Sequence, residues 1–326
     1  MRSVNDKIAD ILACPRCKTS IRPKGDSLAC DVCGIPYEML LDKPTLIMQD
    51  SPVKAWFDPH ASRVGGHGVK GKLVSLWRSL MPSERVWTRK SQALVRQVLE
   101  ATHPDSPDSH VVLIGAGFEP VYKRLLSPYS TVIRVGLAHR EDVDVVCDIC
   151  DLPLAQSSVD LILSSSVLEH VYDPERAVDE MFKAIRPNGY VYAEIPFMRA
   201  YHMIPVDYQR YTISGIASLF GRHGFTEIES GICSGPFTGL ALFLRDFCGG
   251  LFSFSKPLEM LVVLGLSLLL HPMKYLDRLC ENSRWARINA CNFYYLGKKN
   301  STDGDSAASL TQRGYGEDVI QANLTG

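Results

Sequence analysis

The sequence lacks a charge excess of either sign, because 35 Lys and Arg residues face 36 Asp and Glu residues, a net charge of −1 at pH 7. This balance argues against a chain that coats nucleic acid along its whole length. Residues 1–10 lack the apolar core of a signal peptide, and no apolar run reaches the roughly 18 residues that a membrane-spanning helix needs. Ten cysteines in 326 residues are too few for a secreted disulfide scaffold. We therefore expect a reduced, cytoplasmic protein.

Four of the ten cysteines form two CxxC pairs. Cys14 and Cys17 make the first pair, and Cys30 and Cys33 make the second after a spacer of twelve residues. Each pair places two thiolates on one tight turn, an arrangement that suits tetrahedral zinc. Four sulfur ligands leave no vacant position, so the predicted zinc is structural and not catalytic. The alternative is four unrelated free thiols.

The residues around the cysteines strengthen this interpretation. Residues 11–18, 28–37 and 43–47 resemble, in this order, the small zinc-ribbon proteins that activate tRNA, rRNA and release-factor methyltransferases. The resemblance implies a zinc-ribbon-like domain over residues 1–50. A basic linker is expected over residues 51–82. The whole basic stretch, residues 60–99, has eight Lys or Arg against one acid, and it is either an anion-binding surface or a solvated helix face.

From residue 110 onward, short β-branched runs alternate with helical patterns. The expected strands are 110–114, 131–135, 143–147, 159–163, 190–195, 225–229 and 290–296. A helix is expected after Asp173, which can cap it, and Asn188-Gly189 is expected to close it. Such alternation predicts an α/β fold with a doubly wound, mainly parallel sheet that binds ligands beyond the carboxyl ends of its strands.

A series of short motifs sharpens the prediction. The turn at residues 115–117 is followed by motifs at 148–153, 157–162, 167–171 and 185–190, and together they resemble class I S-adenosylmethionine-dependent methyltransferases. The resemblance implies a seven-stranded Rossmann-like sheet within residues 83–299, preceded by the zinc-ribbon domain. It also implies that S-adenosyl-L-methionine is the cofactor. The cofactor-binding residues that it implies are Gly115, Ala116, Gly117, Gly136, Asp148, Ile149, Ser164 and Ser165.

Two positions depart from that pattern. Leu113 stands where family members usually carry an acid, and Gly136-Leu137 is followed by Ala138 instead of an acid that holds the ribose. Glu141 or Asp142 is an alternative ribose ligand. Loss of one buried acceptor costs about 1.5–3 kcal/mol of binding energy, so a non-catalytic scaffold with a degenerate cofactor site remains an alternative.

Two histidines are candidate general bases. His170 follows Glu169 after the expected fourth strand, and His202 lies in a segment expected over the active-site mouth. The alternatives are a helix-starting pair that shapes the cleft and an ordinary loop residue. Cys147 and Cys150 form a further CxxC pair, which we interpret as packed core thiols.

An apolar insertion at about residues 233–285 delays the last strand by roughly 60 residues. It could contact a membrane peripherally through residues 237–270, cap a groove for a lipid-like substrate, or form a buried hairpin or dimer contact. Residues 300–326 have the composition of a disordered tail.

The sequence therefore predicts a methyltransferase that acts on an unidentified acceptor, either a small molecule or a lipid-like, quinone or membrane-linked glycan molecule. The alternative is an RNA or protein methyltransferase that uses the zinc ribbon for docking.

Overall fold

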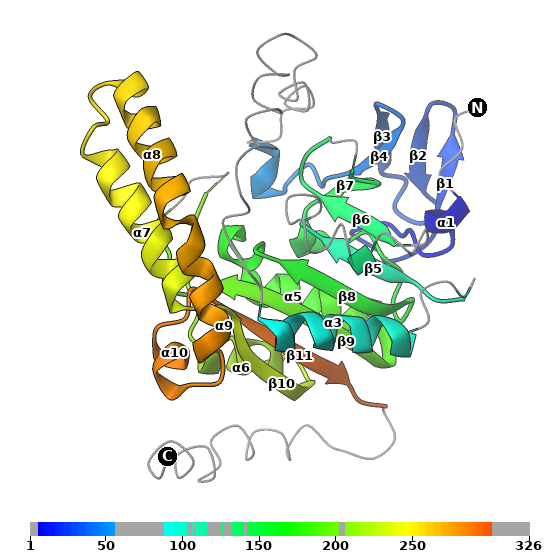
Figure 1. Cartoon of the computed structure of the whole chain (residues 1–326). Helices are drawn as coiled ribbons and strands as arrows, with labels where there is room; N and C mark the ends of the chain where they lie inside the picture. Colours follow the sequence, from blue (N-terminus) through cyan, green and yellow to red (C-terminus); the bar gives the residue numbers. More distant parts are fainter. Residues whose placement is uncertain are drawn as a thin grey trace.

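A single mixed sheet organises the chain (Figure 1). The computed structural model describes residues 6–55, 88–102, 106, 108–115, 125–126, 132–139, 142–201 and 206–301. Within them the sheet has eleven strands in the order β1-β2-β3-β4-β7-β6-β5-β8-β9-β11-β10. The strands are β1 (Ile21–Lys24), β2 (Ser27–Cys30), β3 (Pro36–Leu40), β4 (Lys43–Leu46), β5 (Val111–Ile114), β6 (Ile133–Gly136), β7 (Val145–Cys147), β8 (Val159–Ser165), β9 (Ile185–Pro196), β10 (Phe225–Ser234) and β11 (Asn292–Lys299).

The part of the sheet from β7 to β10 has a doubly wound topology. Strands β7, β6, β5, β8 and β9 are parallel neighbours, whereas β11 runs antiparallel to β9 and β10. The strand order reverses at β5 and β8, so the crevice for a ligand is expected beyond their carboxyl ends. The predicted mainly parallel, Rossmann-like α/β fold is confirmed.

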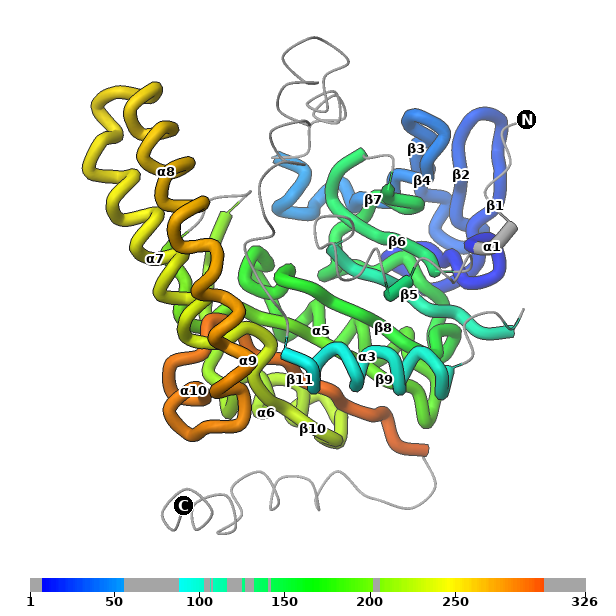
Figure 2. Tube along the Cα trace, viewed as in Figure 1, coloured from blue at the N-terminus to red at the C-terminus, as the bar shows by residue number. Residues whose placement is uncertain are grey.

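The N-terminal strands extend this sheet. Strands β1 to β4 form antiparallel hairpins, and β4 then pairs in parallel with β7 through Thr45↔Val146 and Leu46↔Cys147. Figure 2 shows the N-terminal tube beside β7. The predicted seven-stranded sheet is not confirmed as a separate unit, because β1 to β4 and the seven strands β5 to β11 form one sheet. The edge of β7 would otherwise expose unpaired backbone groups, and β4 covers it.

Helices cover both faces of the sheet. Val112 and Ile114 of β5 belong to the core that includes α5 (Pro174–Ala184) and α6 (Ile213–Arg222), whereas Val111 and Leu113 belong to the core under α3 (Arg89–Thr102). This alternation follows from the period of two in a strand.

The helix predicted after Asp173 is α5. The carboxylate of Asp173 caps it by accepting the Arg176 N–H. The helix ends at Ala184, before the predicted Asn188-Gly189 stop, because Ile185 already pairs with Val159 as the first residue of β9.

The apolar insertion forms a helical hairpin between β10 and β11. It consists of α7 (Pro236–Gly250) and α8 (Lys256–Leu270), followed by the short helices η5 (His271–Leu276), α9 (Asp277–Cys280) and α10 (Arg284–Ile288). Figure 1 shows α7 and α8 extending side by side away from the sheet. Residues 56–87 of the predicted basic stretch and residues 302–326 of the predicted tail lie outside the described residues.

Candidate functional site

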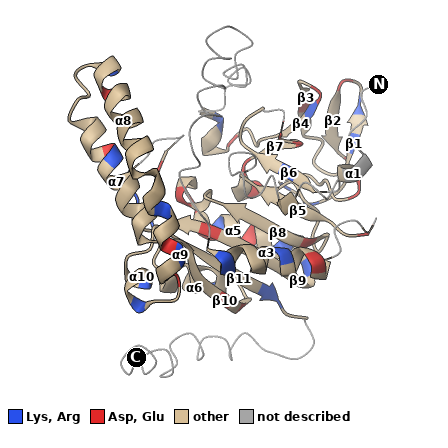
Figure 3. Cartoon of the chain, in the orientation of Figure 1, with Lys and Arg blue, Asp and Glu red and all other residues tan. Residues whose placement is uncertain are grey.

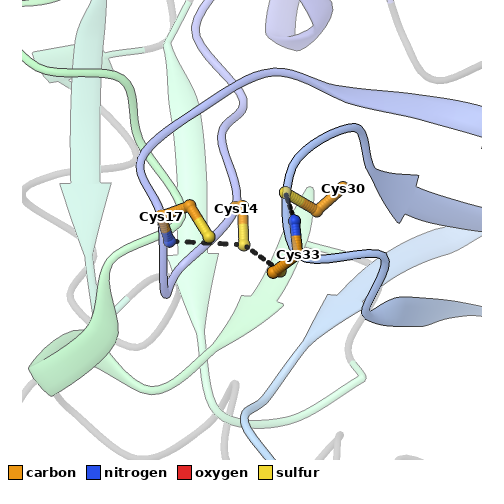
Figure 4. A group of neighbouring side chains, drawn as sticks. All are labelled: Cys14, Cys17, Cys30 and Cys33. Carbon is orange, nitrogen blue, oxygen red and sulfur yellow. Dashed lines mark hydrogen bonds between the residues drawn. The ribbon is translucent and has the colours of Figure 1, made fainter.

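Four thiols meet in the N-terminal segment (Figure 4). The Sγ atoms of Cys14, Cys17, Cys30 and Cys33 all lie within 4.8 Å of one another. The Sγ atoms of Cys14 and Cys33 are 3.7 Å apart. Four thiolates around a tetrahedral zinc, with Zn–S bonds of about 2.3 Å, have a mutual distance of about 3.8 Å. The cluster is therefore compatible with zinc.

Hydrogen bonds to the sulfur favour the charged thiolate at Cys30. The Tyr37 hydroxyl lies 3.1 Å from Cys14 Sγ, and the Thr19 hydroxyl lies 3.3 Å from Cys30 Sγ. Burial opposes ionisation of Cys30. The Thr19 hydroxyl and two backbone N–H groups that donate to its sulfur outweigh this effect and lower the pKa of Cys30 to about 6. Such donors are what a thiolate ligand of a metal needs in its surroundings.

The cysteine segment is fastened to the loop that follows β7. Lys18 Nζ donates to the Leu152 carbonyl oxygen at 2.6 Å and forms an ion pair with Glu180 of α5. The backbone N–H of Ala13 donates to the Pro153 carbonyl oxygen at 2.9 Å. These contacts fix the segment that carries the predicted adenine-binding residues.

Asp148 follows β7 directly and is buried. Its Oδ1 accepts the Cys150 N–H at 3.0 Å, and its Oδ2 accepts the Ser51 hydroxyl at 2.6 Å. A carboxylate offers about four acceptor positions, so Asp148 can take further donors from a ligand. Ile149 begins the short helix η3 (Ile149–Asp151) next to it. No feature of the sequence had indicated Ser51.

Gly115 follows β5 directly and has a backbone conformation that glycine favours, with φ of +80°. A Cβ atom at this position would lie 2.1 Å from Val167 Cγ2 and 3.1 Å from the Ser165 carbonyl oxygen. Glycine therefore permits the close approach of the chain after β5 to the chain after β8. Ala116 and Gly117 lie outside the described residues.

The two predicted serines occupy different environments at the end of β8. Ser164 pairs with Ile114 in the sheet, and its buried Oγ has no hydrogen-bond partner among the described residues. An unsatisfied buried hydroxyl costs about 1–3 kcal/mol, so this atom beside the Gly115 turn fits a polar ligand that completes it. The Ser165 hydroxyl instead donates to Glu194 Oε2 at 3.1 Å.

Glu194 is a buried acid that the sequence reasoning missed. Its other oxygen, Oε1, accepts the Tyr192 hydroxyl at 3.1 Å. The available signal was an acid inside the otherwise apolar strand run at residues 190–195. Two hydroxyls thus hold this carboxyl group near the carboxyl end of β9, where Glu194 pairs with Ser165 of β8.

The two departures from the methyltransferase pattern are visible in the structure. Leu113 packs in the core beneath α3. After Gly136, the chain places buried His139 against β4, with Nε2 at 3.3 Å from Thr45 Oγ1. Asp142 is described and is half-buried, whereas Glu141 lies outside the described residues.

His170 lies at the carboxyl end of β8, in the short helix η4 (Leu168–His170). Its Nδ1 is 2.7 Å from the Val206 carbonyl oxygen, so this nitrogen carries the proton and donates. The other nitrogen, Nε2, lies 3.8 Å from Oε1 of the buried Glu169. His202 lies outside the described residues.

Part of the segment expected over the active-site mouth lies against η4. The Tyr208 N–H donates to the Glu169 carbonyl oxygen at 2.8 Å, and Gln209 Nε2 donates to the Leu168 carbonyl oxygen at 2.8 Å. Residues 206–210 therefore sit beside the predicted base, His170.

Cys147 and Cys150 are packed core thiols, as predicted. Both are buried, and they do not belong to the four-cysteine cluster. Burial, with the nearby charge of Asp148, raises the pKa of Cys150 to about 12. The same two causes raise the pKa of Cys147 well above its usual range.

A cavity of about 460 Å³ lies between the cysteine segment and α5, next to their contact through Lys18 and Glu180. It is lined by both bases and acids, among them Arg16, Asp50 and Arg176, and Ser51 forms part of its wall. Through Ser51 it adjoins Asp148, but the predicted cofactor-binding residues do not line it.

Comparisons with known proteins bear on this site. Residues 125–193, which run from before β6 into β9, match the family model described as "Methyltransferase domain". The prediction of a methyltransferase domain is confirmed. The matched segment includes Asp148, Ser164, Ser165 and His170.

Individual relatives cover less of the chain. An uncharacterized methyltransferase of Mycobacteroides abscessus is 55% identical over 38 residues, which are 12% of this chain and 15% of that protein. A solved phosphoethanolamine N-methyltransferase 2 of Haemonchus contortus is 15% identical, with a TM-score of 0.43 over 75% of this chain and 60% of that one. A putative sarcosine dimethylglycine methyltransferase of Galdieria sulphuraria is 12% identical, with a TM-score of 0.44 over 70% of this chain and 97% of that one.

Proposed function

We propose that the protein transfers a methyl group from S-adenosylmethionine to an acceptor molecule. The observation that carries the proposal is the grouping of three residues where the strand order reverses. There the glycine turn at Gly115, the unsatisfied hydroxyl of Ser164 and the buried carboxylate of Asp148 end three strands of one sheet. The match of residues 125–193 to the methyltransferase domain family supports it.

The residues fit the cofactor in chemistry. Asp148 has acceptor capacity for the amine of adenine, Ile149 offers an apolar side chain for its ring, and Ser164 offers a hydroxyl at the methionine end. When bound, S-adenosylmethionine supplies an electrophilic methyl group on a positively charged sulfur. Acidic groups favour a cationic ligand, and the buried carboxyl groups of Glu169, after β8, and Glu194, near the end of β9, lie at the same edge of the sheet as Asp148.

Positioning of the acceptor accounts for most of the rate in this proposal, because a displacement in line needs the nucleophile held opposite the methyl group. His170 is the proposed base where the acceptor must lose a proton. Its Nε2 is oriented as an acceptor by the bond from Nδ1 to the Val206 carbonyl. His202 remains a second proposed base.

The proposed acceptor is a small or lipid-like molecule. The support for a lipid-like acceptor is the apolar hairpin α7–α8, which joins the sheet between β10 and β11, next to β9 and Glu194. The proposed role of the four-cysteine cluster is to hold one structural zinc ion, which stabilises the N-terminal strands against β7.

Titration calorimetry with S-adenosylhomocysteine tests cofactor binding. We expect Asp148→Ala to weaken the affinity about ten- to hundredfold, as loss of a charged acceptor worth about 1.5–3 kcal/mol requires. Asp179→Ala is the matched control, because Asp179 is a solvent-exposed acid of α5 paired with Lys183. Absence of heat from the wild type at millimolar ligand would leave only a non-catalytic scaffold.

Transfer of labelled methyl groups into fractionated extracts tests the acceptor. Label in the lipid-soluble or small-molecule fraction is the expected result. Label confined to RNA or protein would reject this acceptor class while keeping the methyltransferase.

A further inference from the structure

The hairpin of α7 and α8 leaves large apolar side chains in contact with solvent. On α7 and the following turn, Leu240, Phe243, Phe247 and Leu251 are 46–60% exposed, and their spacing places them on one stripe. At the tip of the hairpin, Phe254 is 80% exposed. Residues packed against a protein core do not keep this exposure, so the hairpin is unlike the helices that cover the sheet.

Helix α8 has no buried residue at all. Its most exposed apolar side chains are Met260, Leu261, Leu268 and Leu269, at 55–72% exposure. At 3.6 residues per turn they spread over roughly half of the helix circumference. The apolar face of a surface helix in a soluble domain is normally buried against the core, whereas this apolar half of α8 is exposed, as in a helix that lies against lipid.

The helical segment from Lys256 to Cys280 has the length and composition to cross a membrane. Only 6% of its most apolar 18-residue stretch is buried in the protein. Its 25 residues measure about 37 Å at 1.5 Å per residue, compared with a hydrocarbon core of about 30 Å. The sequence prediction counted only uninterrupted apolar residues and therefore found no segment of this length. In the structure the helical path continues from α8 through η5 and α9.

The hairpin enters and leaves the domain on the same side. It starts from β10 and returns to β11, and these two strands are hydrogen-bonded neighbours. The carboxylate of Asp277 accepts the N–H groups of Phe237 and Thr238 at 2.8 and 3.1 Å, so the base of the hairpin is fixed. A single crossing is incompatible with this connection, which leaves a re-entrant hairpin.

The base of the hairpin carries the side chains that favour a membrane surface. Tyr275 and Trp285 are half-exposed, and Arg278, Arg284 and Arg287 are exposed beside them. Figure 3 shows basic and acidic residues at this end and only a few charged residues along the hairpin itself. Aromatic rings and arginines are enriched at the headgroup level, where arginine attracts anionic lipid.

The few charges of the hairpin itself are paired. Arg245 Nε donates to Asp246 at 2.7 Å, and Lys256 Nζ donates to Glu259 at 2.8 Å. Pairing lowers the free-energy cost of moving charges out of water.

From these features we infer that the α7–α8 hairpin inserts into one face of a lipid bilayer, with Arg278, Arg284 and Arg287 at the level of anionic headgroups. This attachment goes beyond methyl transfer and is independent of the cofactor site. It holds the carboxyl ends of β9 and β10, and the amino end of β11 beside them, close to the membrane surface.

Flotation of the full-length protein with vesicles tests the inference. The probe is vesicles of phosphatidylcholine alone, or with one-third phosphatidylserine, at 0.15 M salt. We expect the protein to float with both, and more strongly with the anionic vesicles. The Leu261→Glu/Leu269→Glu variant is expected to lose at least about tenfold in vesicle partitioning, because two exposed leucines no longer enter the hydrocarbon.

The matched control is Leu41→Glu/Ile228→Glu, which adds the same charge at apolar residues that are 59% and 50% exposed outside the hairpin. It should float like the wild type. Arg284→Glu/Arg287→Glu should reduce binding to anionic vesicles only.

Two results would overturn the inference. One is a wild type that floats with neither vesicle. The other is a dimer by light scattering that Leu261→Glu/Leu269→Glu dissociates without any vesicle binding, since the hairpin then covers a second copy. Calorimetry with S-adenosylhomocysteine on the same variants separates this outcome from a failure of the proposed function.

Discussion

The ion pair between Lys18 and Glu180 gives a direct test of how the N-terminal segment is held to the sheet. The two side chains are 14% and 8% exposed, and Lys18 also donates to the Leu152 carbonyl oxygen. Breaking a buried ion pair by removing one partner costs about 3–5 kcal/mol. Lys183 Nζ lies 3.2 Å from the other oxygen of Glu180 and still compensates part of its charge. We therefore expect Lys18→Met to lower the free energy of unfolding by about 2–4 kcal/mol.

Urea unfolding followed by circular dichroism measures this change. The matched control is Lys183→Met, which removes the 44% exposed partner of the same carboxylate and should cost less than about 1 kcal/mol. Because β4 pairs with β7, the loss at Lys18 should shift the whole transition and not a separate N-terminal one. If Lys18→Met costs no more than Lys183→Met, burial of the pair does not fasten the segment.

Three further predictions follow from single residues. Ser164→Ala should leave the unliganded protein as stable as the wild type or slightly more stable by urea unfolding, because the hydroxyl has no partner among the described residues. The same substitution should lower the affinity for S-adenosylhomocysteine in calorimetry, because the proposed ligand supplies that partner. Reduced affinity together with lost stability would assign Ser164 to the fold instead. Elemental analysis should find about one zinc ion per wild-type chain and almost none in Cys30→Ser, which should also have a lower melting temperature. A wild-type protein that contains no zinc would reject the metal site. Burial, and then the charge of Lys43, lower the pKa of His139 below 6.5 in the folded state. The unfolded state therefore binds the proton more readily, so the free energy of unfolding should decrease as the pH falls below 6.5. Melting temperatures at pH 7.5 and 5.5 should differ less in His139→Asn, and an equal difference would exclude His139 as a source of the pH dependence.

The strands around the crevice were predictable because each has a strong local signal. Val111–Ile114 is a short β-branched run followed at once by glycine, and the cap of α5 is a single Asp-Pro pair. Asp148 was predictable through the resemblance of its surrounding motif. Its contact with Ser51 was not, since 97 residues separate the two and only the pairing of β4 with β7 brings them together.

Glu194 shows a second limit of sequence patterns. An acid in an apolar strand indicates a special position, but the hydroxyls that hold it come from Ser165 on the neighbouring strand and Tyr192 two residues earlier. Register between strands decides such contacts, and local periodicity carries no register.

The sequence by itself determined the cysteine pairs, the alternation of strands and helices, the glycine turn and the apolar character of residues 237–270, because each depends on neighbours a few positions away. Only the tertiary structure decided that the cysteine segment continues the central sheet, that Ser164 lacks a partner among the described residues, and that the apolar hairpin stands away from the core. Those outcomes depend on which strand edges and helix faces stay uncovered once the sheet has formed. The hydrophobic effect is not directional, so the apolar pattern of the sequence does not specify which residues come into contact.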